Sequence, residues 1–72
     1  MTEAIQLLDV VALTEELPQW GLCRGQVGTV VELLAPGVFE VEFCANGGRM
    51  YASLALRTDQ LLVLHDRPLE VA

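Results

Sequence analysis

The chain has 72 residues, enough for one domain. A domain of this size buries only about 60% of the surface of its unfolded chain, so we expect a thin core. Hydrophobic residues make up 53% of the sequence. This exceeds the ~45–50% usual in soluble domains and predicts that some apolar side chains face a protein partner or a second copy of the chain. The formal net charge is −6 and every cation is an arginine. That charge argues against binding to nucleic acid or to an anionic membrane surface, since both attract Lys and Arg.

The first residues and the cysteines bear on the cellular location. Met1-Thr2-Glu3 lacks the basic start and apolar run of a signal peptide, and no apolar stretch approaches the ~20 residues of a membrane helix. We therefore expect a cytoplasmic protein that has no membrane partner. Its two cysteines, Cys23 and Cys44, are expected to be reduced thiols rather than a disulfide.

The predicted domain extends over residues 9–65, with an N-terminal arm at residues 1–8 and a C-terminal tail at residues 66–72. Its first element is a strand over residues 9–13, in which alternate apolar residues face one side. A long loop follows over residues 14–25.

Proline and glycine divide this loop into short pieces, at Pro18, Gly21 and Gly25. One turn of helix fits over residues 14–17. Three apolar side chains are expected to hold the loop against the domain: Leu17, Trp20 and Leu22.

Residues 24–32 are the stretch around which the fold is organised. Gly25 supplies a sharp turn, and Gly28 lets the strand bend or lets another backbone come close. The β-branched run at residues 29–31 favours a half-buried strand, which we place at residues 26–34.

Pro36 and Gly37 predict a tight turn, and residues 38–44 then form the clearest strand of the chain. Its two faces differ, with apolar residues on one and acidic residues on the other. The apolar face consists of Phe39, Val41 and Phe43, and the acidic face of Glu40 and Glu42.

Asn46-Gly47 is the strongest hairpin signal of the sequence. As a two-residue turn, it places Phe43 opposite Met50 and makes every inward pair with the next strand, residues 50–56, apolar. A slip of one residue would mix the faces. The same reasoning turns Glu32 outward and three residues of the preceding strand inward: Val27, Val31 and Leu33.

A tight helical turn at residues 57–60 and a fifth strand at residues 61–65, apolar on both faces, complete the domain. The order of a long first loop, a three-stranded meander, one helical turn and a short last strand is that of an SH3-like barrel. The predicted fold class is therefore all-β, a small five-stranded SH3-like barrel.

Four blocks of sequence carry a family resemblance. They are DVVALTEELP at residues 9–18, GLxRGQVGTVVE at residues 21–32, FEVEF at residues 39–43 and YAxL at residues 51–54, followed by Leu61. The chain resembles, over about residues 7–65, a bacterial family catalogued as domain of unknown function 4926. The resemblance implies an SH3-like barrel and implies no activity. More loosely, Gly25-x-x-Gly28-Thr29-Val30 is similar to the KOW motif of RNA- and protein-binding barrels, without the basic residues that surround it in RNA binders.

Trp20 is a candidate binding anchor, since a tryptophan on a loop is typical of interaction hot spots. Pro18 and Tyr51 are the residues that could join it in an SH3-type groove for a proline-rich peptide. The alternative is that Trp20 plugs one end of the barrel.

A second candidate is an acidic strip on the outer face of the second and third strands, formed by Glu32, Glu40 and Glu42. It could dock a basic partner, or it could be a solvated face that keeps an apolar protein soluble.

The sequence contains no catalytic, metal or cofactor motif. Cys23, Cys44 and His65 are scattered without the paired spacing of a zinc site, and no nucleophile accompanies the neighbours His65 and Asp66. We predict a non-enzymatic protein–protein interaction module that self-associates or masks a basic partner. The alternatives are a KOW-like RNA-binding barrel and an antitoxin or immunity-type partner of a neighbouring gene product.

Overall fold

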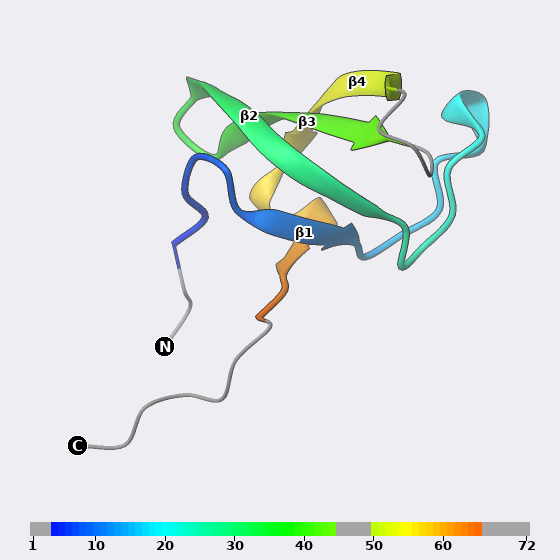
Figure 1. Ribbon diagram of the computed structural model, residues 1–72, viewed down its shortest axis with the longest axis horizontal. Helices are drawn as coiled ribbons and strands as arrows, with labels where there is room; N and C mark the ends of the chain where they lie inside the picture. The colour runs from blue at the N-terminus through cyan, green and yellow to red at the C-terminus, as the bar shows by residue number, and fades with distance from the viewer. Residues whose placement is uncertain (1–3, 45–49, 66–72) are drawn as a thin grey trace.

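The computed structural model describes residues 4–44 and 50–65 and shows an all-β domain. The described residues form one antiparallel sheet of five strands in the order β4-β3-β2-β1-β5 (Figure 1). Because β1 lies between β2 and β5, the last strand pairs with the first. The strands are β1 (Val10–Leu13), β2 (Val27–Ala35), β3 (Val38–Cys44), β4 (Met50–Arg57) and β5 (Leu61–Val63).

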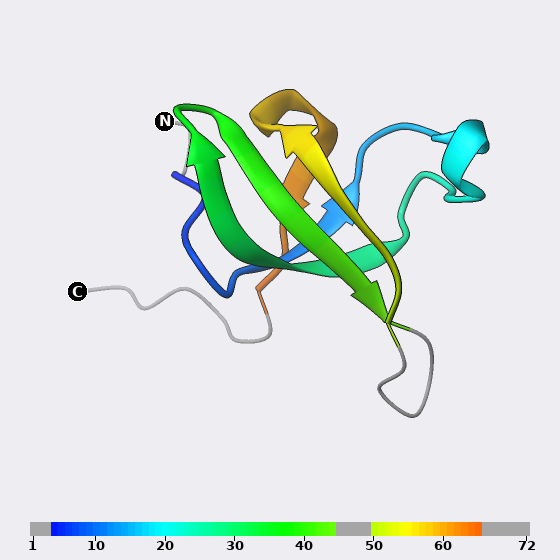
Figure 2. The same cartoon turned by 90° about the horizontal axis from the view of Figure 1, so that it is seen from above.

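The sheet bends along the long strand β2, so that β1 and β5 lie across from β3 and β4 (Figure 2). The two halves enclose one hydrophobic core. Its fully buried side chains come from three strands: Val11, Val30, Val41 and Phe43. Burial of a side chain of this size stabilises the folded state by about 1.5–3 kcal/mol. Because the bend in β2 brings the two halves of the sheet face to face, one small sheet can bury these side chains.

Two predicted glycine turns are confirmed. Gly37 has a φ of 75° and, with Pro36, forms the two-residue turn between the paired residues Ala35 and Val38. Gly25 has a φ of 89° in the turn that leads into β2. Residues with a side chain reach such φ values only at a cost, so glycine is the fitting residue at both turns.

The β3–β4 pairing differs from the predicted register by two residues. Phe43 lies opposite Ala52 rather than Met50, and the pairs further along the strands move by the same two positions. Side-chain direction in a strand repeats every two residues, so this shift leaves every face unchanged and the hydrophobic pattern does not detect it. A bulge near the end of β3 accompanies the change. The predicted Asn46-Gly47 turn lies outside the described residues.

The side-chain directions in the first half of β2 are the reverse of those predicted. Gly28 and Val30 face the core there, and the inward position at residue 28 gives no hydrophobic signal because glycine has no side chain. Glu32 nevertheless faces outward as predicted, since a bulge between Val30 and Glu32 reverses the alternation. Three side chains that were predicted to be inside are exposed: Val27, Val31 and Leu33.

The predicted helical turn in the long loop is misplaced. The loop instead contains a 3-10 turn, η1 (Pro18–Trp20), with the proline at its first position, where a missing amide hydrogen costs nothing. Leu17 and Leu22 hold the loop as expected, because both are buried and their backbones exchange two hydrogen bonds. Trp20 does not hold it, since 54% of its surface is exposed.

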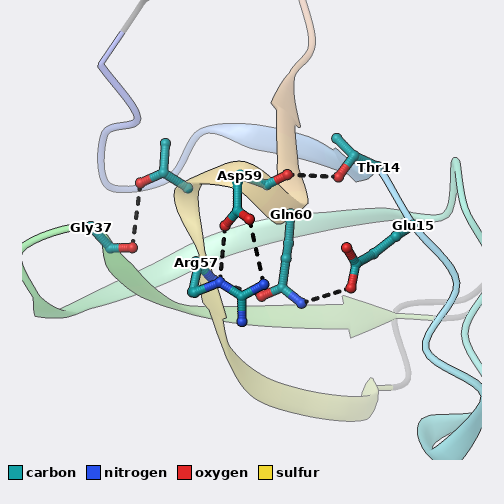
Figure 3. Close-up of polar contacts among 7 residues, drawn as sticks. Thr14, Glu15, Gly37, Arg57, Asp59 and Gln60 are labelled. Carbon is teal, nitrogen blue, oxygen red and sulfur yellow. Dashed lines mark hydrogen bonds and ion pairs between the residues drawn. The ribbon is translucent and has the colours of Figure 1, made fainter.

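The predicted helical turn before the last strand is confirmed as the 3-10 turn η2 (Thr58–Gln60), and the strand after it is shorter than expected. Thr14 Oγ1 donates a hydrogen bond to the backbone oxygen of Asp59 at 2.8 Å, which ties the start of the long loop to η2 (Figure 3). Arg57 and Asp59 form an ion pair, with 3.0 Å between Nε and Oδ1. Both side chains are exposed, so the pair adds little stability.

Gln60 is the polar side chain buried at this junction. Its Oε1 accepts a hydrogen bond from the Arg57 amide at 2.9 Å, and its Nε2 donates one to Glu15 Oε2 at 3.2 Å (Figure 3). The side-chain amide of Gln60 therefore joins the long loop to η2, the turn that precedes β5.

We expect Gln60→Glu to lower the free energy of unfolding by about 1–3 kcal/mol at neutral pH, because it replaces a donor to Glu15 with a second carboxylate. Urea denaturation at neutral pH measures it. Gln19→Glu, the same change on the exposed turn η1, is the matched control, and equal effects of both variants would contradict the assignment.

Candidate functional site

The predicted Trp20 site is only partly described by the structure. Pro18 and Trp20 share η1, and both are exposed. Tyr51 belongs to β4, and its side chain lies outside the described part of the structure. The interpretation of Trp20 as a plug is wrong, because a plug would be buried. A groove shared by the three residues stays a prediction.

The predicted acidic strip lies where the sequence placed it. Glu32 is directly opposite Glu40 across β2 and β3, and Glu42 lies two residues further along β3 on the same outward face. Glu40 Oε2 accepts a hydrogen bond from Ser53 Oγ at 2.7 Å, and Glu42 Oε1 accepts one from the Cys44 thiol at 3.6 Å. The hydrogen-bond partners within the described residues are thus neutral groups.

Sequence reasoning missed a second surface, which we call the apolar face. It is the outward side of β5, β1 and the start of β2, and neighbouring strands align its members in two rows. In the first row Leu62 lies opposite Ala12, and Ala12 lies opposite Val27. The second row consists of Leu64 and Val10, which are neighbours because the Leu64 amide donates a hydrogen bond to the Val10 backbone oxygen at 2.9 Å. The large side chains of the face are exposed by 58% (Leu62), 48% (Val27), 44% (Val10) and 38% (Leu64).

One sequence signal did point toward this surface. The fifth strand was expected to be apolar on both faces, and an edge strand of a small domain has only one face to bury. Leu61 occupies that buried face, which leaves Leu62 outside. The pairing of Leu62 with Ala12 and Val27 depends on the register between strands far apart in the sequence, which the hydrophobic pattern does not supply.

The described part of the N-terminal arm extends this surface. Ile5 packs against the core, and the Leu8 amide donates to the Val30 backbone oxygen at 2.7 Å, so the arm packs on its own domain. Leu8 has a φ of 71°, a left-handed conformation that costs a residue with a side chain about 1–2 kcal/mol. Leu8 is 70% exposed and, with Val10 and Leu64, lines a shallow hollow of about 420 Å³.

Residues 7–63 match the model of a family described as domain of unknown function (DUF4926). The chain belongs to the DUF4926 family. Comparison with curated proteins and with solved structures found no match. The matched DUF4926 segment contains the acidic strip and most of the apolar face, with Leu64 just beyond it.

In this DUF4926 domain the two cysteines are not bonded to each other. Cys23 and Cys44 are free and exposed, as the sequence predicted for reduced thiols. Residues 4–44 and 50–65 bring together no group of three or more His, Cys, Asp or Glu side chains able to hold a metal ion. Among the same residues, no helix is long and apolar enough to cross a membrane.

Cys44 lies beside the acidic strip, and its surroundings disfavour the thiolate. Partial loss of hydration raises the pKa of the Cys44 thiol, and the neighbouring Glu42 carboxylate raises it further. Since the thiolate is the reactive form, a higher pKa slows alkylation at any pH below it.

We therefore expect Glu42→Gln to speed the alkylation of Cys44 about two- to tenfold near pH 8 and to move the midpoint of the rate–pH curve to lower pH. The measurement uses the Cys23→Ser background with iodoacetamide, so that Cys44 is the thiol that reacts. Glu32→Gln removes the same charge from the strip without touching Cys44. An equal acceleration by Glu32→Gln would contradict a local effect of Glu42.

Proposed function

We propose that this domain is a non-enzymatic protein–protein interaction module that binds its partner through the apolar face. The observation that supports it most is that four of the exposed large apolar side chains lie together on adjacent strands: Val10, Val27, Leu62 and Leu64. Covering such a face removes apolar surface from water, which is the main favourable term in most protein association.

Two further observations support the proposal. Within the described residues β5 pairs with β1 alone, so the outer edge of β5 offers backbone groups that a partner strand can pair with. The free thiols of Cys23 and Cys44 suit the reducing conditions of the cytoplasm, where we place this interaction.

The test is site-specific photo-cross-linking of the full chain in the cells that make it. A photoreactive amino acid replaces Leu62 on the apolar face, Gln19 beside Trp20, or Glu16 as an exposed loop position that belongs to neither surface. We expect one discrete adduct from position 62, no adduct from position 16, and loss of the adduct when Val10→Asp is added. An adduct from position 19 alone would place binding at the Trp20 loop, and equal or absent adducts at all three positions would overturn the proposal.

A further inference from the structure

The outer surface of the sheet changes from apolar to acidic over two strands. Val10 of the apolar face pairs with Thr29, which pairs in turn with Glu42 of the acidic strip. Strands are about 4.8 Å apart, so the strip begins about 10 Å from the centre of the apolar face. A specific interface needs about 800 Å² on each partner, more than the outward side of three short strands provides. A partner that covers the apolar face therefore extends beyond it, and on the β3 side it meets the strip.

Among residues 4–44 and 50–65, the hydrogen-bond partners of the strip are neutral groups. Glu32 and Glu40 are like charges directly opposite each other, an unfavourable cross-strand pair. The ion pair that forms within the same described residues joins Arg57 to Asp59 and includes no carboxylate of the strip. The side of the apolar face toward β3 is thus bordered by the carboxylates of the strip.

A second copy of the chain is a poor match for this border. The sequence has ten acidic residues against four arginines, and one of those arginines, Arg57, already binds Asp59. Another copy would bring the same strip and a further charge of −6. Charge complementarity calls for a partner with the opposite sign.

We infer that the partner is a different protein whose docking surface carries apolar side chains bordered on one side by Lys or Arg. The apolar side chains cover Val10, Leu62 and Leu64, and the cationic groups contact Glu42 and Glu40. This inference rests on the proposed function and specifies the chemistry of the partner. The apolar contacts hold the complex together, and the charges set its orientation and its rate of formation.

The experiment is an NMR titration of the isotope-labelled full chain with three short peptides. The first alternates Leu and Lys, the second alternates Leu and Glu, and the third alternates Ser and Lys. We expect the Leu/Lys peptide to shift the amide signals of both the apolar face and the strip, and to bind at least about tenfold more tightly than the other two at about 0.15 M salt. Glu42→Gln should weaken it about threefold or more, whereas Glu16→Gln, the same charge change at an exposed loop position, should leave it unchanged.

Different outcomes would contradict the inferred chemistry of the partner and the proposed function. Equal shifts of the apolar face by the Leu/Lys and Leu/Glu peptides, with the strip unaffected, would overturn the cationic border and leave the proposed function standing. Equal binding of the Ser/Lys and Leu/Lys peptides would reduce the effect to general charge attraction and overturn the inference. Concentration-dependent shifts at Val10 and Leu62 without any peptide would assign the face to a second copy and overturn the inference as well.

Discussion

Phe43→Ala is expected to lower the free energy of unfolding by about 3–5 kcal/mol, the usual cost of removing a buried phenylalanine side chain. Phe43 is fully buried near the end of β3, and its ring belongs to the cluster that joins the two halves of the bent sheet. A domain of 72 residues has a total stability of about 4–11 kcal/mol. The loss is therefore a large fraction of the total stability.

Urea denaturation followed by far-UV circular dichroism measures this loss. Phe43→Leu keeps most of the buried volume and should cost about 1–1.5 kcal/mol. Leu34→Ala removes an apolar side chain of which 43% is exposed, and should cost clearly less than either core change. If Phe43→Ala cost no more than Leu34→Ala, the ring could not be the centre of the core.

The alternation in β3 predicted its core face correctly because Phe39, Val41 and Phe43 lie on one side and both acids on the other. That pattern also located Glu40 and Glu42 on the outer surface. The neighbouring strand failed the same reasoning at Gly28 and Val31, where a glycine and a bulge interrupt the period of two. Periodicity identifies a strand and its faces but does not predict where the alternation changes.

The candidate surfaces differ in how far the sequence could predict them. The acidic strip follows from residues close together in the sequence, so Glu32 and Glu40 could be placed on one face before their pairing was seen. The apolar face joins Val27, Val10 and Leu62, which lie far apart in the sequence. No local pattern reports which strands become neighbours, and the topology alone brings these residues together.

At Gly28, the addition of a single methyl group should lower the stability of the domain. A Cβ at this position would lie 2.8 Å from Val41 Cγ1 and 2.9 Å from Phe43 Cδ2 and Cε2. The sequence suggested close approach of another backbone, but the atoms in the way are these two side chains. Both are fully buried and cannot move without displacing the rest of the core. We therefore expect Gly28→Ala to lower the free energy of unfolding by about 1–3 kcal/mol through overpacking.

A double-mutant cycle shows whether steric overlap causes the loss. The φ of Gly28 is not positive, so backbone strain is not the reason for glycine there. Phe43→Leu removes ring atoms from the contact, and Gly28→Ala should cost about 0.5–1 kcal/mol less in that background. Gly25→Ala is the contrasting control, because no atom lies within 4 Å of its added Cβ and its cost comes from a φ of 89°. The cost of Gly25→Ala should be the same whether position 43 is Phe or Leu. Strictly additive effects of Gly28→Ala and Phe43→Leu would contradict the packing explanation.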